Sequence, residues 1–80
     1  MNLKQVIVNR VLQICDERGI KPNELAVLSG ITPSTVYSFM DSTRKEVYIS
    51  TIKKLCDGLE ISLGEFFTAP EFEGLEQEIK

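Results

Sequence analysis

The chain has 80 residues, of which 42% are hydrophobic, and a formal net charge of −3. This length allows one small domain, and this hydrophobic fraction is too high for a disordered segment. There is no His, and the only Cys residues are Cys15 and Cys56, which excludes a closed zinc site, a multi-disulfide scaffold and catalysis by His. We therefore expect no enzyme, no metal or other cofactor, and a reducing, cytoplasmic location.

No segment favours membrane insertion or export. The longest stretch without charge, residues 25–40, is interrupted by polar residues, Gly30 and Pro33. The short apolar run after Lys4 is not followed by a small-residue cleavage site, so no secretory signal is expected.

The negative charge is confined to the C-terminal end of the chain. Residues 1–69 carry eight bases and eight acids, whereas residues 70–80 carry four Glu and one Lys. From residue 21 to residue 54 there are five bases and three acids, so the middle of the chain is slightly basic. The placement of charge matters more for nucleic-acid binding than its total. We therefore divide the chain into a domain over residues 1–69 and an acidic tail over residues 70–80.

The first predicted helix runs from residue 3 to about residue 18. Its apolar residues recur at spacings of three and four, as on one helical face: Leu3, Ile7, Val11 and Ile14. Asn2 is expected to cap the start of this helix. Gly19 stands where helices often end in a left-handed residue.

Two further helices are predicted from Pro22 to Ser29 and from Pro33 to Met40, each with proline at its first position. The link between them is too short for anything except a tight turn, so we expect positive φ at Gly30 and a small residue, Ala26, where the backbones approach. The side chains expected to fill this corner are Leu25, Ile31, Val36 and Phe39. The pattern is typical of a helix-turn-helix unit; the alternative is an ordinary corner in a helical bundle.

The polar residues 41–46 predict a loop, after which two more helices follow. Ser50 is the expected N-cap of the fourth helix, and Ser62 and Glu65 predict a capping box at the start of the fifth. The apolar residues of these helices are Ile52, Leu55, Cys56, Leu59, Phe66 and Phe67. No stretch alternates with period two, so the fold class is all-α.

The acidic tail has its own apolar pattern. Phe72, Leu75 and Ile79 predict a short helical face, which Gly74 weakens. This face is expected to pack on the domain or on a second protomer.

The order and spacing of these motifs resemble the Cro/lambda-repressor-type (XRE-family) DNA-binding domain. The resemblance covers about residues 3–67, and the motifs that carry it are Glu24–Ala26, Ser29–Ile31, Pro33–Val36, Ser50–Cys56 and Leu59–Phe67. It implies a compact five-helix lambda-repressor-like domain that binds double-stranded DNA sequence-specifically, usually as a dimer on a palindromic operator.

The resemblance also implies that the third helix enters the major groove. Its expected base contacts are Pro33, Ser34, Thr35, Tyr37 and Ser38, with Val36 and Phe39 turned inward. The family often has Gln, Arg or Asn at three of these positions, where this chain has Pro33, Ser34 and Ser38. Bidentate base contacts are therefore missing, and direct readout should be modest. The alternative role for the hydroxyl residues is helix capping and exposure to solvent.

The expected phosphate contacts are Lys21, Asn23, Thr43, Arg44 and Lys45. The family commonly starts its second helix with Gln where this chain has Pro22, so Lys21 and the amide groups at that helix start are expected to substitute. Asp41 stands where the family often has Asn, and its charge should repel a phosphate unless the side chain turns away. The alternative for Arg44 and Lys45 is a solvated loop.

The sequence thus predicts a transcriptional regulator, most readily a repressor. A protomer with so few phosphate contacts binds DNA weakly at physiological salt, so we expect a homodimer. The alternative is a protein-binding module, such as an antitoxin whose residues 70–80 bind a protein partner. Cys15 and Cys56 are expected to be core residues.

Overall fold

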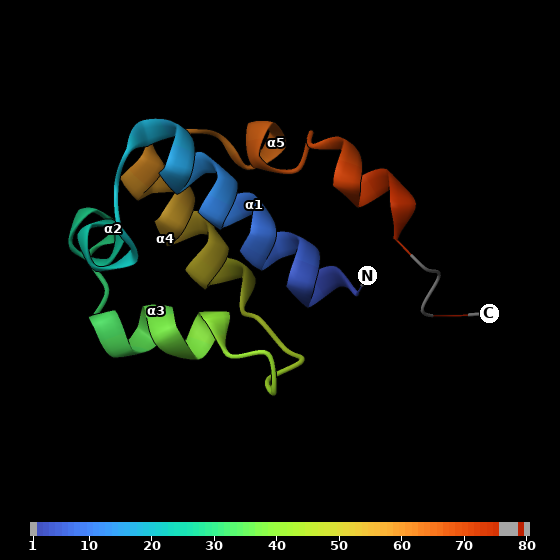
Figure 1. The fold of residues 1–80 in the computed structure, drawn as a ribbon, viewed down its shortest axis with the longest axis horizontal. Coiled ribbons are helices and arrows are strands. Elements are labelled where there is room, and N and C mark those ends of the chain that lie inside the picture. The colour runs from blue at the N-terminus through green and yellow to red at the C-terminus, as the bar shows by residue number, and fades with distance from the viewer. Residues whose placement is uncertain (1, 76–78, 80) are drawn as a thin grey trace.

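A computed structural model describes residues 2–75 and residue 79. The described part of the chain contains five α-helices and a 3₁₀ helix, and none of it is in a strand (Figure 1). The helices are α1 (Leu3–Arg18), α2 (Pro22–Ser29), α3 (Pro33–Met40), α4 (Ile49–Leu59) and α5 (Leu63–Phe66), followed by the 3₁₀ helix η1 (Pro70–Gly74). The predicted all-α class is confirmed.

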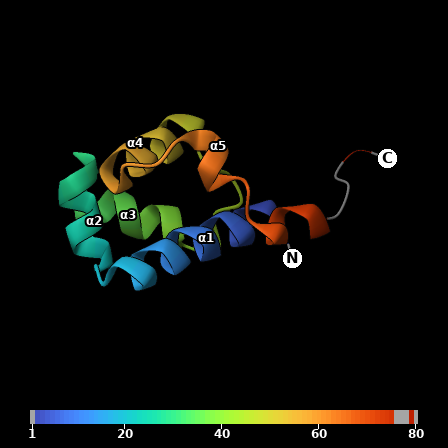
Figure 2. The ribbon, with the colours of Figure 1, turned by 90° about the horizontal axis from the view of Figure 1, so that it is seen from above.

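The helices surround one core. Seen from above, α1 lies on one side, α4 and α5 lie on the other, and α2 crosses one end of the molecule (Figure 2). The α2 helix contacts α1, α3 and α4, and α5 contacts α4. The 3₁₀ helix η1 contacts α1 at the end of the molecule away from α2. This arrangement leaves one side of α3 uncovered.

Every α-helix contributes to the buried core. Its members include Ile7, Val11, Ile14, Cys15, Leu25, Phe39, Ile52, Leu55, Cys56, Leu59 and Phe66. Ala26 and Val36 are also buried, and Ile31 packs against the core. The apolar face predicted for α1 is wrong at Leu3, which is 40% exposed, because the first residue of the helix extends beyond the packed region.

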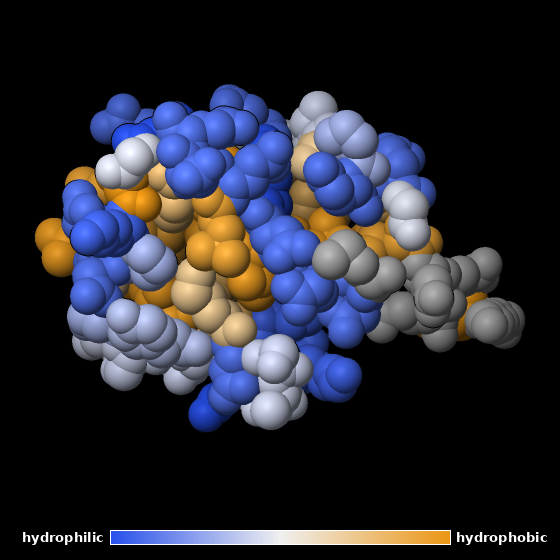
Figure 3. All heavy atoms as spheres, viewed as in Figure 1, coloured by the Kyte–Doolittle hydropathy of each residue, from blue (hydrophilic) through white to orange (hydrophobic). Residues whose placement is uncertain are grey.

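Polar side chains cover most of the face seen in the space-filling view, where apolar side chains show beside α1 and at the edge formed by α2 (Figure 3). Val27 and Leu28 of α2 are 78% and 56% exposed. The two cysteines are free and buried, and burial raises the pKa of both thiols. Their environment fits the predicted packing role. No helix within residues 2–75 and 79 has the length and apolar character that crossing a membrane requires.

Local capping signals define most of the helix ends. The side chain of Asn2 accepts the Gln5 amide at 2.8 Å. Gly19 and Gly30 have φ of 65° and 70°, in the left-handed region that favours glycine. At α5, Ser62 Oγ accepts the Glu65 amide at 3.0 Å, which is the first half of the predicted capping box.

The predicted N-cap of the fourth helix is wrong. The α4 helix begins at Ile49, so Ser50 is already helical and Tyr48 is the capping residue. The amides of Thr51 and Ile52 donate to the Tyr48 carbonyl at 3.0 and 3.2 Å. Packing of the buried face of α4 outweighs the local preference for serine at the cap, because tertiary contacts supply most of a helix's stability.

The first part of the tail lies against the domain. The Phe72 ring centroid is 5.1 Å from that of Phe67 and 6.2 Å from that of Phe66. The helical geometry ends at Gly74, and Leu75 is extended. Residues 76–78 and 80 of the predicted tail helix lie outside the described residues, and the division of the chain at residue 69 stays a prediction.

Candidate DNA-binding surface

One side of α3 is buried and the opposite side faces solvent. Val36 and Phe39 are 1% and 6% exposed. The five expected base contacts are at the surface: Pro33, Ser34, Thr35 and Tyr37 are exposed, and Ser38 is half-buried. The geometry of α3 therefore presents these residues together.

Hydroxyl groups form a small network at the start of α3. Thr32 Oγ1 accepts the Thr35 amide at 3.2 Å, and it lies 3.0 Å from Ser34 Oγ and 2.9 Å from Thr35 Oγ1. The capping residue is Thr32, and the hydroxyls of Ser34 and Thr35 bond to its side chain. A hydroxyl has one donor and two acceptor sites, so a bond to Thr32 leaves capacity for a base edge.

A hydrogen bond joins α3 to the start of α2. The Tyr37 hydroxyl donates to Asn23 Oδ1 at 3.0 Å, which brings an expected base contact beside an expected phosphate contact. Lys21 is exposed, and its amide donates to the Glu24 carboxylate at 3.3 Å. The charge of Glu24 weakens the attraction of this helix start for an anion.

A surface hollow of about 220 Å³ lies along α3. The residues that line it are Ser34, Thr35, Ser38, Phe39, Arg44, Glu46, Val47, Tyr48 and Thr51. The hollow brings Ser34 and Ser38 together with Arg44. Glu46, Tyr48 and Thr51 were missed at this surface because folding alone brings the end of the loop and the start of α4 beside α3.

The two expected loop bases lie in different places. Arg44 lines the hollow along α3, whereas Lys45 lines a second hollow with Asn2, Leu3 and Lys4 at the start of α1. The sequence predicts Arg44 and Lys45 as neighbouring phosphate contacts. In the structure the two side chains line different hollows.

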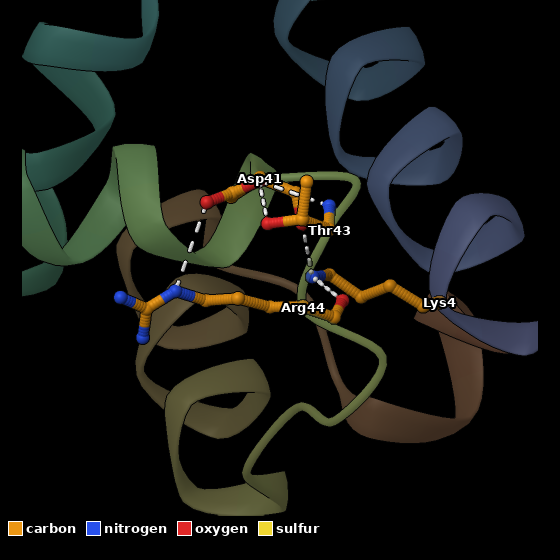
Figure 4. A network of polar contacts seen from close by, with 4 residues as sticks. All are labelled: Lys4, Asp41, Thr43 and Arg44. Carbon is orange, nitrogen blue, oxygen red and sulfur yellow. Dashed lines mark hydrogen bonds and ion pairs between the residues drawn. The ribbon is translucent and has the colours of Figure 1, made fainter.

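The Asp41 side chain is turned toward its own loop (Figure 4). Its Oδ1 accepts the Thr43 hydroxyl at 2.7 Å and the Thr43 amide at 2.9 Å, and its Oδ2 is 3.8 Å from Arg44 Nε. The bond from the Thr43 hydroxyl, then the Thr43 amide bond, holds the pKa of Asp41 below its usual value. The carboxylate is therefore bonded within the turn, and it keeps its negative charge beside Arg44.

Lys4 is a buried base that sequence reasoning missed at this surface. It is 6% exposed, and its Nζ donates to the carbonyl oxygens of Asp41 at 3.1 Å and Arg44 at 2.8 Å. Nζ also lies 6.0 Å from the centroid of the Phe39 ring. No local signal predicts these contacts, because they join residues about 40 positions apart along the chain.

The other two bases of α1 also bond to backbone carbonyls. Arg10 donates to the carbonyl oxygens of Phe66 at 2.8 Å and Glu65 at 3.1 Å. Arg18 donates to the Leu59 carbonyl. These cations hold loops and helix ends, so their charge is not centred on the α3 surface.

These features are those of a helix-turn-helix surface. One side of α3 is uncovered, a tight turn links it to α2, and hydroxyl and basic residues surround it. A family model described as the Cro/C1-type HTH DNA-binding domain matches residues 10–71. The chain belongs to this family. The matched stretch includes α2, α3 and the loop that carries Arg44.

This Cro/C1-type domain is similar to curated regulators. It is 36% identical over 62 residues to the HTH-type transcriptional regulator PuuR of Escherichia coli (strain K12), and equally to PuuR of Shigella flexneri. The match covers 78% of this chain and 33% of each regulator, so the chain spans about one third of the length of these relatives.

The fold has a counterpart among solved structures. The crystal structure of the prophage Lp1 protein 11 has a TM-score of 0.82 and 26% identity to this chain, and the match covers 94% of this chain and 100% of that one. The five-helix architecture is thereby confirmed. The family match assigns residues 10–71 to a DNA-binding domain of the Cro/C1 type.

Proposed function

We propose that the chain is a transcriptional repressor that binds double-stranded DNA as a homodimer, with α3 in the major groove. The observation that carries the proposal is the solvent-facing side of α3, where Ser34 and Ser38 adjoin Arg44 in one hollow. A recognition helix needs this arrangement, in which base-reading side chains and phosphate-binding groups approach the duplex together.

Two of the expected phosphate contacts, Asn23 and Arg44, adjoin α3 from different elements. Asn23, at the start of α2, bonds to Tyr37, and Arg44 lies beside Ser34 and Ser38. Phosphate contacts on both sides of a groove would fix the orientation of α3, while the hydroxyls face the base edges. Because serine and threonine bond to several bases, we expect much of the specificity to come from DNA shape and from two half-sites.

A dimer supplies the affinity that one protomer lacks. Three or four phosphate contacts per protomer correspond to a log–log salt slope of about −3, and a dimer doubles it. Three bases on α1 donate to backbone carbonyls in other parts of the domain. This leaves few cations for phosphates and supports the need for two copies.

The test is selection from a random duplex DNA pool at low and near-physiological salt. We expect an enriched site with two-fold symmetry, whose half-site spacing gives the dimer geometry. Absence of binding at both salt concentrations would overturn the proposal, and binding without enrichment would restrict it to non-specific DNA binding.

The role of α3 is tested by Ser34→Ala combined with Ser38→Ala in the same selection. We expect a relaxed base preference with the fold retained, because both hydroxyls are near the surface. Ser50→Ala, an exposed serine on α4, is the control and should keep the wild-type preference. An unchanged preference in the double variant would remove α3 from the major groove.

The protein-binding alternative rests on the tail. Phe72, one of its three apolar residues, packs on Phe66 and Phe67 of the same chain, so it is not available as a partner contact in this arrangement. Deletion of residues 76–80 keeps Phe72 and the two rings on which it packs. Under the repressor proposal, the truncated chain keeps its DNA binding.

A further inference from the structure

The Lys4 ammonium group holds both ends of one turn. The turn is closed by the Arg44 amide, which donates to the Asp41 carbonyl at 3.1 Å. Lys4 Nζ donates to that same carbonyl and to the Arg44 carbonyl, at 3.1 and 2.8 Å. Figure 4 shows Lys4 reaching the turn from α1, while the Arg44 side chain leaves it in the opposite direction.

Burial makes this contact depend on the shape of the turn. A lysine is rarely buried, and its charge needs hydrogen-bond partners once water is removed. The two carbonyls supply these partners only while residues 41–44 keep their conformation. Loss of the ammonium group would leave the Arg44 carbonyl without this donor, and the turn would gain freedom.

The conformation of the turn decides where its side chains lie. With its carbonyl bonded to Lys4, Arg44 directs its side chain to the hollow that it shares with Ser34 and Ser38. Thr43 is held by its two bonds to Asp41. A turn that is ordered before DNA arrives loses less conformational freedom on binding than a mobile one, and this raises affinity.

We propose that Lys4 is a positioning residue for the DNA contact, which acts by ordering the turn of residues 41–44 rather than by touching DNA. This inference rests on the proposed function, in which Arg44 contacts a phosphate beside α3. It assigns a role in binding to a side chain that is almost entirely covered by protein.

The test compares Lys4→Met with Lys54→Met in the full chain, on the DNA site selected by the wild type. Both variants lose one positive charge, but Lys54 is exposed on α4 and controls for the charge alone. We expect Lys4→Met to bind about tenfold more weakly than Lys54→Met, the scale of one hydrogen bond to a charged group. The salt slope of Lys4→Met should be shallower by about 0.9 per protomer, because Arg44 would lose its phosphate contact. The preferred DNA sequence should be unchanged.

Two further measurements separate positioning from stability. Amide hydrogen exchange without DNA should be faster at Thr43 and Arg44 in Lys4→Met than in the wild type, and unchanged in α1 and α4. Lys4→Arg, which keeps the charge and the donors, should recover most of the affinity.

The outcomes are distinct. Any one of four results overturns the inference. These are equal affinity of Lys4→Met and Lys54→Met, unchanged exchange at the turn, no rescue by Lys4→Arg, and loss of the helical circular dichroism signal in Lys4→Met. Failure of the wild type to bind any DNA overturns the proposed function instead. In that case, the exchange experiment still decides whether Lys4 orders the turn.

Discussion

The basic residues of α1 and those of the loop after α3 have the same chemistry and opposite surroundings. Lys4, Arg10 and Arg18 direct their donors to backbone carbonyls in other parts of the fold. Arg44 and Lys45 are exposed, and each lines a surface hollow. A count of charges treats all these residues alike. The comparison teaches that the cations of α1 are held by backbone carbonyls inside the fold, whereas Arg44 stays exposed even though its Nε lies 3.8 Å from the Asp41 carboxylate.

The largest expected effect is on stability, from Arg10→Met. This variant loses the bonds from a charged group to the carbonyls of Glu65 and Phe66, which should lower the free energy of unfolding by about 1–3 kcal/mol. Urea denaturation followed by circular dichroism measures the change. Lys54→Met is the control and should remain within about 0.5 kcal/mol of the wild type.

The Arg10 variant also tests the comparison itself. At a temperature where it is folded, its salt slope for DNA binding should equal that of the wild type. A shallower slope with normal stability would show that Arg10 makes or supports a phosphate contact, and would contradict the division between inward and outward bases.

A smaller effect, on DNA affinity, is expected from Arg44→Ala combined with Lys45→Ala. We expect affinity for all DNA sequences to fall about equally, by about 1–2 kcal/mol, and the salt slope to become shallower by about 1.8 per protomer. The free energy of unfolding should change by less than about 0.5 kcal/mol, because both side chains are exposed. Binding titrations at several salt concentrations measure the slope, and an unchanged slope would make these residues a solvated loop.

The smallest effect concerns Asp41 and pH. Its pKa in the folded chain lies below the usual value near 3.8, so its contribution to the turn is complete above that value and is lost as the pH falls through the lowered pKa. We expect the Thr43 amide resonance of the wild type to titrate below about pH 4.

Asp41→Asn is the matched variant for the pH experiment. The asparagine keeps an oxygen that accepts the Thr43 amide but does not titrate, so its Thr43 resonance should stay constant over the same range. Identical pH dependence in both chains would show that another acid controls the turn.

Features that depend on neighbouring residues could be predicted from the sequence. The bounds of α2 and α3, the Asn2 cap and the positive φ at Gly30 all follow from local preferences within one or two helical turns. The inward direction of Val36 and Phe39 followed from the helical period. These predictions are confirmed because each depends on few residues with strong preferences.

Features that join distant segments could not be predicted in the same way. The start of α4 at Ile49, rather than after Ser50, depends on how the whole helix packs. The packing of Phe72 on Phe66 and Phe67 depends on the path of the chain after α5. The assignment of residues to bases and phosphates stays a prediction that DNA binding has to test. The expected base contacts are Pro33, Ser34, Thr35, Tyr37 and Ser38, and the expected phosphate contacts are Lys21, Asn23, Thr43, Arg44 and Lys45.

The sequence by itself determined the helices, their order and the family to which the chain belongs, because periodicity, capping and short links act locally. Only the tertiary structure decided which cations remain for a partner and which hold the fold together. A lysine at position 4 looks like a surface residue on the first turn of a helix. Its ammonium group becomes structural because α1 and the loop after α3 meet in space, and a buried ammonium group must find acceptors where the fold places them.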